Sequence, residues 1–243
     1  MGTVVETRAE TPSARSIIFD VPGWTGNVAG QHVDVRLTAP DGYQAVRSYS
    51  IASVPSPAGD DLQRVQLAVD RLPDGEVSPY LVDELQVGDQ VELRGPLGGW
   101  FVWKPAVDGT EQTEPVQLIA GGSGIVPFVA MIRAHAASAS TASFRLLYSV
   151  RSPEDRFFVA ELEELEGPLL EITWVYTRET PSGWPTPPGR VTEEILARST
   201  IAASENPAVF VCGPTGFVEA VASHLVALGH NPLTVKTERF GGA

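Results

Sequence analysis

The spacing of apolar residues changes near residue 110, and this change constrains the possible folds more than any other feature of the chain. Before it, short β-branched runs alternate apolar with polar residues and are separated by turns such as Pro40-Asp41-Gly42. Strict alternation predicts half-buried strands, and their spacing predicts an antiparallel barrel or sandwich. The expected strands cover residues 3–8, 16–20, 32–37, 47–51, 65–71 and 90–94, and one short helix is expected over 79–85, with Ser78 as its N-cap.

After a polar segment at residues 104–114, the pattern is different. Continuous apolar runs, which are typical of buried strands, cover residues 116–120, 144–150, 169–177 and 208–212. They alternate with helical stretches at 127–137, 157–165, 192–199 and 215–228, which predicts a parallel sheet with right-handed crossovers. We therefore expect two domains: an N-terminal antiparallel β-barrel over residues 1–107 and a C-terminal Rossmann-like α/β domain over residues 113–243.

Charge and hydropathy exclude several classes of partner. The 243 residues contain 17 Lys and Arg against 30 Asp and Glu, a formal net charge of -13. Because this field repels phosphate backbones, nucleic acid is not an expected partner. No window approaches the roughly 18 consecutive apolar residues of a membrane span, and the N-terminal Met-Gly-Thr-Val-Val-Glu lacks the basic and apolar regions of a signal peptide. The expectation is a cytoplasmic, monomeric protein without a membrane span.

The single cysteine, Cys212, limits the chemistry of the chain. One thiol cannot form an intrachain disulfide, a Cys-rich zinc site or an iron–sulfur cluster. The four histidines show no H-E-x-x-H or comparable ligand spacing, so no protein-held catalytic metal is expected. Any redox chemistry then depends on an organic cofactor.

A glycine-rich loop follows the first strand of the second half. Residues 118–127 read Leu-Ile-Ala-Gly-Gly-Ser-Gly-Ile-Val-Pro, a strand end followed by Gly121, Gly122 and Gly124 and then a helix start. Parallel sheets bind ligands at the carboxyl ends of their strands, glycines let a ligand approach backbone N–H groups, and the helix dipole favours an anion. A tight strand-to-helix turn without a ligand is the alternative interpretation of this motif.

A second run, Arg47-Ser48-Tyr49-Ser50, lies on an expected strand of the first half. Alternate residues of a strand share a face, so Arg47 and Tyr49 project one way, and Ser48 and Ser50 the other. A cation that pairs with a pyrophosphate, beside a ring that stacks, suits a flavin dinucleotide. Arginine and tyrosine on an exposed barrel face, without a ligand, are the alternative.

Five segments in a fixed order resemble the signatures of the ferredoxin–NADP reductase superfamily. They are Arg-Ser-Tyr-Ser at 47–50, Asp-Gly-Glu-Val-Ser at 74–78, Gly-Pro-Leu-Gly-Gly at 95–99, the glycine loop at 121–127, and Cys-Gly-Pro at 212–214. The resemblance spans nearly the whole chain. The tail at 237–241, Thr-Glu-Arg-Phe-Gly, is similar to that of stand-alone bacterial members without a fused iron–sulfur domain. The resemblance implies a barrel that binds FAD and a Rossmann-like domain that binds NAD(P).

The resemblance also assigns roles in the first domain. It implies that Arg47 pairs with the FAD pyrophosphate, that Tyr49 packs against the flavin ring, and that Ser50 lies near the flavin N5, which receives hydride. The resemblance implies that Val77 and Ser78, at the start of the expected short helix, hold the diphosphate through backbone N–H groups and a hydroxyl, although a hairpin turn with a helix cap is compatible with residues 75–78. The remaining cofactor-binding residues implied here are Ser48, Gly75, Val77 and Ser78.

In the second domain, the resemblance implies that Cys212 and Gly213 border the nicotinamide near its reactive carbon. A buried structural cysteine is the alternative. Phe240 resembles the aromatic tail residue that covers the flavin, although plant-type tails end in tyrosine. The implied catalytic set is Ser50, Cys212 and Phe240, and the nucleotide's pyrophosphate is assigned to Gly122, Ser123 and Gly124.

Two arginines bear on which nicotinamide is used. Arg178 follows the strand expected at 169–177, and Arg190 follows a Pro-rich loop. Two guanidiniums suit the dianionic 2′-phosphate of NADPH, whereas an acidic residue suits the ribose of NADH. Glu179 leaves the opposite preference open, and ordinary surface arginines are a third interpretation. We expect NADPH to be preferred.

The resemblance therefore implies an oxidoreductase that passes hydride from NAD(P)H to FAD and electrons to a separate acceptor, such as a ferredoxin or an oxygenase component. A non-catalytic flavin- or nucleotide-binding subunit of a larger enzyme complex is the alternative from a different class.

Overall fold

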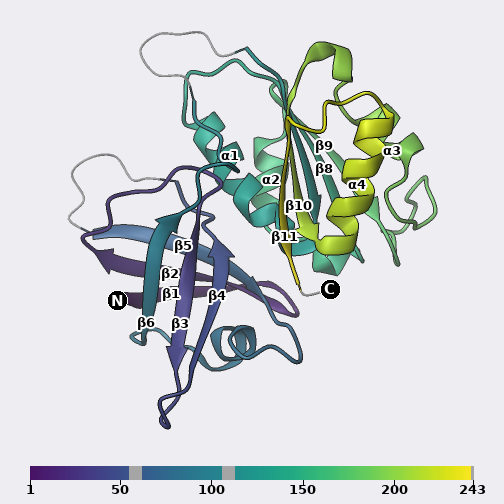
Figure 1. Cartoon of the computed structure of the whole chain (residues 1–243). Coiled ribbons are helices and arrows are strands. Elements are labelled where there is room, and N and C mark those ends of the chain that lie inside the picture. The colour runs from purple at the N-terminus through teal and green to yellow at the C-terminus, as the bar shows by residue number, and fades with distance from the viewer. Residues whose placement is uncertain (55–61, 106–112, 242–243) are drawn as a thin grey trace. The chain divides into compact units, whose positions relative to one another are not determined.

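The computed structural model describes residues 1–54, 62–105 and 113–241, which fall into two compact units (Figure 1). The first unit contains Met1–Lys104 and Val126–Ala134, and the second contains Pro105–Ile125 and His135–Ala243. The predicted join near residue 110 lies outside the described residues, and the boundaries at 107 and 113 stay a prediction.

Six antiparallel strands form the first unit, in the order β4-β3-β6-β1-β2-β5. An isolated bridge between Ile51 and Leu67 joins the two ends of this order, so the sheet closes into the expected barrel. Alternation along the strands explains the closure, because every second side chain, such as Val33 and Val35, is buried in one core. The strands are β1 Gly2–Thr11, β2 Ala14–Pro22, β3 His32–Thr38, β4 Gln44–Ser50, β5 Leu62–Asp70 and β6 Gln90–Leu97.

The short helix of the first unit differs from the expectation. It is a π-helical turn, η1, at Tyr80–Glu84, and Pro79 precedes it as N-cap without a side-chain hydrogen bond. The prediction that Ser78 caps this helix is wrong, because the Ser78 hydroxyl instead accepts the backbone N–H of Leu72 at 3.0 Å. Ser78 therefore closes the turn that precedes the helix.

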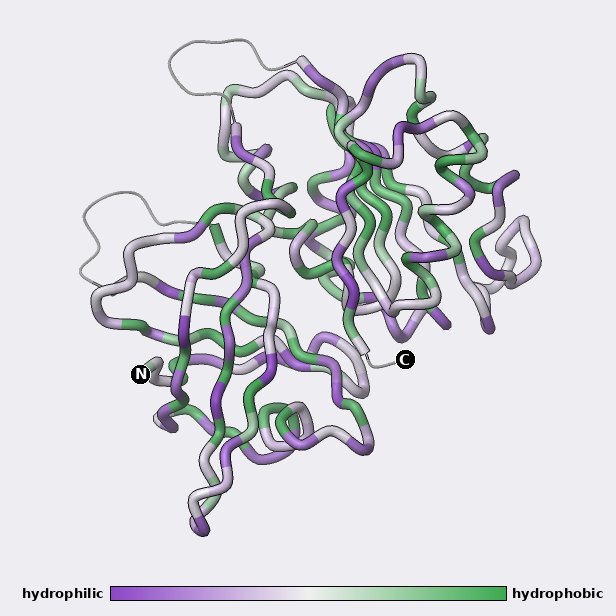
Figure 2. The backbone as a smooth tube through the Cα atoms, in the orientation of Figure 1, coloured by the Kyte–Doolittle hydropathy of each residue, from purple (hydrophilic) through white to green (hydrophobic). Residues whose placement is uncertain are grey.

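Five parallel strands form the second unit, in the order β11-β10-β7-β8-β9. All six residues of β7 are buried, which explains the apolar run that predicted this strand, and Figure 2 shows apolar colour along the inner strands of this sheet. The strands are β7 Val116–Gly121, β8 Phe144–Val150, β9 Leu170–Tyr176, β10 Ala208–Pro214 and β11 Val235–Phe240. The α-helices of the second unit are α2 Val159–Leu165, α3 Glu193–Ser199 and α4 Thr215–Ala227, whereas most of α1 Val126–Ala136 belongs to the first unit. The 3₁₀ turns of the second unit are η2 Gly122–Ile125, η3 Pro153–Asp155 and η4 Ala203–Glu205.

The strand order creates a topological switch point between β7 and β10. From β7 the chain proceeds outward to β8 and β9, and it then returns to the other side of β7 to form β10 and β11. In open parallel sheets, the carboxyl ends of the strands at such a point leave a crevice for a ligand. None of the helices in the described ranges is both long and apolar enough to cross a membrane.

Candidate functional site

The first group of predicted site residues lies on β4. Arg47 is paired with Val35 and Tyr49 with Val33, both buried, so these two side chains start from the inner face of the sheet. The Tyr49 ring packs against the barrel core, and burial raises the pKa of its hydroxyl to about 12. Ser48 lies on the opposite face, where its hydroxyl donates to the Asp34 carboxylate at 2.7 Å.

The second group lies in the turn before η1. A Cβ at Gly75 would come within 2.8 Å of the Ser78 hydroxyl, so this turn requires glycine. Val77 is buried, and Ser78 is 5% exposed. The turn is therefore a fixed piece of backbone, and it leads directly into the helical residues Ser78 and Pro79 that precede η1.

Glu76 connects the two groups. Its carboxylate accepts a hydrogen bond from Arg47 Nη2 at 2.5 Å and another from the Tyr43 hydroxyl at 2.7 Å. Arg47 thus reaches from β4 to the turn that contains Gly75 and Ser78. The sequence reasoning did not find this link, because Arg47 and Glu76 are 29 residues apart and no local pattern joins them.

Ser50, the predicted neighbour of the flavin N5, is paired with His32 across β4 and β3. Directly opposed residues of an antiparallel pair share a face, so the His32 and Ser50 side chains project from the same face of the sheet. The His32 ring also packs against Gly98, whose Cβ would lie 3.2 Å from Nδ1. Sequence reasoning considered His32 only as a metal ligand, and only the strand register places it beside Ser50.

In the second unit, the glycine loop and the Cys212 segment meet at the switch point. A Cβ at Gly124 would lie 2.3 Å from the carbonyl oxygen of Cys212, so these two backbones are in direct contact. Gly121 and Gly213 both face the Phe217 ring of α4, where a Cβ would come within 2.7 and 2.8 Å. Close packing accounts for these three glycines.

Gly122 has a different requirement. Its φ is +55°, and nothing in the described part of the chain lies within 4 Å of the position that its Cβ would take. Gly122 and Ser123 are half-buried, so their backbone can be approached from this side. Packing alone therefore does not account for Gly122.

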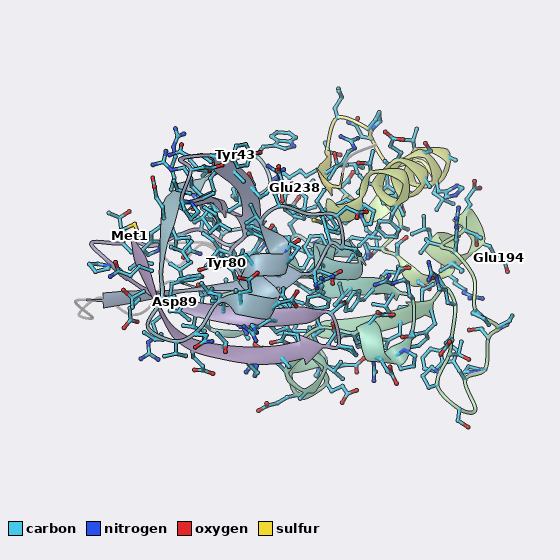
Figure 3. All side chains as sticks on the ribbon, turned by 90° about the horizontal axis from the view of Figure 1, so that it is seen from below. Met1, Tyr43, Tyr80, Asp89, Glu194 and Glu238 are labelled. Carbon is cyan, nitrogen blue, oxygen red and sulfur yellow. The ribbon has the colours of Figure 1, made fainter. Side chains whose placement is uncertain are left out.

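Cys212 and Glu238 are neighbours on adjacent parallel strands. Cys212 is 2% exposed, and burial raises the pKa of its thiol well above the ordinary value, with the Glu238 carboxylate adding to the shift. Burial also raises the pKa of Glu238 to about 7. Both groups are therefore held towards their neutral forms. Glu238, labelled in Figure 3, lies on a strand that the sequence did not predict.

Phe240 ends β11 beside Pro214 and is 38% exposed. Because β10 and β11 are parallel, Phe240 and Cys212 lie towards the same carboxyl edge of the sheet. The C-terminal segment is also held by a hydrogen bond from the Thr215 hydroxyl to the carbonyl oxygen of Gly241 at 3.2 Å.

Arg178 and Arg190 both lie next to the carboxyl end of β9. The N–H of Gly189 donates to the carbonyl oxygen of Tyr176 at 2.9 Å, which closes the Pro-rich loop onto the end of β9. The N–H groups of Arg178 and Glu179 both donate to the carbonyl oxygen of Arg151, at the end of β8. Arg151, which sequence reasoning missed, forms an ion pair with Asp155 at 3.4 Å.

Comparisons with known proteins identify both units. Residues 2–102 match the oxidoreductase FAD-binding domain, and residues 118–223 match the oxidoreductase NAD-binding domain. The chain belongs to the ferredoxin–NADP reductase superfamily. The expected superfamily, two-domain fold, and FAD and NAD(P) cofactor classes are thereby confirmed.

Relatives within this superfamily cover most of the chain. It is 31% identical over 243 residues to the glycine betaine monooxygenase reductase subunit of Chromohalobacter salexigens, covering 98% of this chain and 63% of that protein. It is 27% identical over 214 residues to the toluate 1,2-dioxygenase electron transfer component of Pseudomonas putida, covering 88% and 59%. The chain therefore spans about three fifths of the length of these relatives.

One solved structure aligns with nearly the whole of this chain. The flavohem-like FAD/NAD-binding domain of nitric oxide dioxygenase from Vibrio cholerae O1 biovar El Tor aligns with a TM-score of 0.83 and 25% identity. The match covers 99% of this chain and 98% of that one.

The residues present fit the two groups that the superfamily uses. Arg47 offers a guanidinium beside a turn whose Gly75 has no room for a side chain, and guanidiniums bind phosphates well. Gly122 offers approachable backbone at the switch point. Within the described ranges, no group of three or more His, Cys, Asp and Glu side chains could hold a metal ion.

Proposed function

We propose that the chain is a flavoprotein reductase that takes hydride from NADPH, in preference to NADH, and delivers electrons to a separate acceptor such as a ferredoxin or an oxygenase component. One observation carries this proposal: a single chain combines an FAD-binding and an NAD-binding oxidoreductase domain. Relatives named as reductase or electron transfer components of oxygenases support the choice of acceptor.

In the barrel, Arg47 binds the FAD diphosphate by charge-assisted hydrogen bonds, and the turn that holds Gly75, Val77 and Ser78 presents backbone N–H groups and a hydroxyl to it. Tyr49 packs against the flavin, and its buried, neutral hydroxyl suits an apolar contact. Ser50 positions the reactive edge of the ring, and Ser48 supports the strand from the other face through Asp34.

In the α/β domain, the backbone of Gly122, Ser123 and Gly124 binds the diphosphate of the nicotinamide nucleotide. Cys212 and Gly213 border the nicotinamide, and Phe240 at the same carboxyl edge contributes an aromatic contact. The closed loop that brings Arg178 and Arg190 to the end of β9 supports a site for a 2′-phosphate, and hence the preference for NADPH.

When bound, FAD supplies the redox chemistry: it accepts an electron pair as hydride and releases the electrons singly to an acceptor. The chain's own residues bind FAD and the nicotinamide nucleotide, orient both and exclude water from the site. Ferricyanide is an expected acceptor for the isolated protein, whereas cytochrome reduction is expected only with an added carrier. The proposal includes a monomeric state and a cytoplasmic location, and one cysteine in 243 residues suits a reducing compartment.

The deciding experiment mixes the purified protein, loaded with FAD, with NADPH or NADH without oxygen and follows the flavin absorbance. Rapid bleaching, faster with NADPH, is expected. The double variant Arg178→Ala, Arg190→Ala should lose apparent affinity for NADPH only. An unchanged or absent flavin spectrum would favour a non-catalytic binding subunit, and equal loss for both nucleotides would remove the argument for NADPH.

A further inference from the structure

Three side chains form a cluster on the first unit that the proposed function does not use in full: Tyr43, Arg47 and Glu76. Both carboxylate oxygens of Glu76 are bonded, Oε1 to the Tyr43 hydroxyl and Oε2 to Arg47 Nη2. Arg47 Nη1 also donates to the carbonyl oxygen of Val46 at 2.7 Å. Figure 3 labels Tyr43, which lies in the turn between β3 and β4. The guanidinium assigned to the FAD diphosphate is thus already paired with an anion of the same chain.

We propose that Glu76 is an internal competitor of the FAD diphosphate, which occupies Arg47 in the FAD-free protein and thereby sets the affinity for FAD. The inference rests on the proposed function, because it assumes that Arg47 binds FAD. Glu76 would be an affinity-determining residue and not a catalytic one.

The chemistry of the pair supports competition. Carboxylates and phosphates both accept charge-assisted hydrogen bonds from a guanidinium, and Glu76 Oε2 already occupies Arg47 Nη2, so the two anions compete for the same donor. Paired with Glu76, Arg47 contributes no net charge to attract a diphosphate. The side chains are 52% and 46% exposed, and exposed ion pairs are weak, so a diphosphate can displace the carboxylate.

The backbone around Glu76 is held in place, so only the Glu76 side chain needs to move when a diphosphate displaces it from Arg47. Gly75 is confined by the Ser78 hydroxyl, and Val77 is fully buried, so the residues on both sides of Glu76 are fixed. The hydrogen bond from Tyr43 lowers the pKa of Glu76, which keeps the competitor charged at neutral pH. Tyr43 remains available as a partner when the carboxylate leaves Arg47.

The test measures the dissociation constant of FAD for the FAD-free full chain, by quenching of flavin fluorescence at low ionic strength. Glu76→Gln keeps an acceptor for Tyr43 but loses the charge, and it should bind FAD about two- to five-fold more tightly, the range expected from breaking an exposed ion pair. Asp74→Asn is the matched control, because it removes one negative charge from the same turn without touching Arg47. It should change the constant by less than Glu76→Gln does.

A double-variant cycle isolates the pair. In an Arg47→Ala background, the gain from Glu76→Gln should shrink to that of Asp74→Asn. Weaker or unchanged binding by Glu76→Gln would overturn the proposal and show that Glu76 orients Arg47. Equal gains from Glu76→Gln and Asp74→Asn, or an undiminished gain without Arg47, would also overturn it.

The same titration separates this inference from the proposed function. If the unaltered chain takes up no FAD, both fail together. If the chain binds FAD and Arg47→Ala weakens binding, while Glu76→Gln does not strengthen it, only the competition fails.

Discussion

Adjacent residues of β4 provide a matched pair for the FAD site. Arg47 and Ser48 point to opposite faces, and Ser48 already donates to Asp34. We predict that Arg47→Ala loses a charge-assisted contact of about 1.5 to 3 kcal/mol, so that affinity for FAD falls about 10- to 100-fold, whereas Ser48→Ala has a smaller effect. The FAD-to-protein ratio after gel filtration measures both. Equal FAD content in the two variants would count against the assigned site.

The Cys212 thiol is buried and uncharged, so we propose that it contributes to the shape of the nicotinamide site and not to its charge. The backbone contact between its carbonyl oxygen and Gly124 fixes where the thiol lies. We predict that Cys212→Ala leaves FAD content intact but slows flavin reduction by NADPH by roughly 10- to 100-fold, because small misplacements of reacting groups cost rate steeply. Stopped-flow absorbance checks this, with Cys212→Ser as the conservative variant. An unaltered reduction rate in Cys212→Ala would leave the thiol with a packing role only.

Glu238 predicts a pH dependence of stability. Its folded-state pKa of about 7 exceeds the ordinary value of 4.5, because burial disfavours the charge. Between pH about 4.5 and 7, the unfolded chain loses this proton while the folded chain keeps it, so the free energy of unfolding falls as pH rises and then levels off. The loss of unfolding free energy over this range is at most about 3.5 kcal/mol, at about 1.4 kcal/mol per pKa unit.

Urea unfolding at several pH values tests this contribution. Glu238→Gln should remove it, so that the difference in unfolding free energy between the unaltered chain and the variant declines from pH about 4.5 to 7. Glu194→Gln, an exposed substitution on α3, serves as the control. A pH-independent difference for Glu238→Gln would show that this carboxyl titrates normally.

At the scale of elements, α1 is joined to the barrel strands by a chain of hydrogen bonds within the first unit. Arg133 Nη1 on α1 donates to the carbonyl oxygen of Ala52 and to Gln66 Oε1, both at 2.8 Å. Gln66 Nε2 donates to the Ser16 hydroxyl at 3.0 Å, which in turn donates to Glu10 at 2.6 Å. Gln66 and Ser16 are buried, so each partner left unsatisfied is costly.

We predict that Gln66→Leu lowers the free energy of unfolding by about 1 to 3 kcal/mol, because it removes the two hydrogen bonds of the Gln66 side chain, while Arg133 keeps Ala52 and Ser16 keeps Glu10. Gln90→Leu is the control, since Gln90 is exposed on β6 and its substitution should change stability by about 0.5 kcal/mol or less. Denaturant unfolding gives both values. Similar losses in the two variants would show that the buried chain of bonds contributes little.

The strands and helices also show how much of the fold could be predicted from the sequence. Alternating and continuous apolar runs predicted strands such as β3 and β7, because burial directly imposes those periods. The edge strand β11, Val-Lys-Thr-Glu-Arg-Phe, was missed because its residues are only half-buried or exposed and three of them have ionisable side chains. Phe158, expected inside α2, instead precedes it with φ +55°, a conformation that tertiary packing imposes on a bulky residue.

The candidate site shows the same difference between residues that the sequence predicted and residues that only the structure revealed. The glycine loop and Arg47 were found locally, because their chemistry is written in consecutive residues. The partners Glu76, His32 and Glu238 come from other segments, and only strand register and tertiary contact bring them to Arg47, Ser50 and Cys212. A chain read one segment at a time contains no signal for such pairs.

At the scale of the whole molecule, the net charge of -13 acts on any acceptor that arrives from solution. An anionic acceptor approaches a like-charged protein more slowly than a neutral one, and salt weakens the repulsion as the screening length shortens from about 30 Å at 0.01 M to about 8 Å at 0.15 M. The proposed reductase should therefore show an acceptor-dependent response to ionic strength.

We predict that kcat/KM for ferricyanide, an anion, rises roughly two- to ten-fold between 0.01 and 0.15 M salt, with NADPH saturating so that its own binding does not limit the rate. An uncharged quinone is the control acceptor and should show little change over the same range. The ratio of the two responses isolates the electrostatic effect on the acceptor from any effect of salt on the protein. A rate for ferricyanide that falls with salt would mean that a local positive patch, and not the net charge, governs the approach of the acceptor.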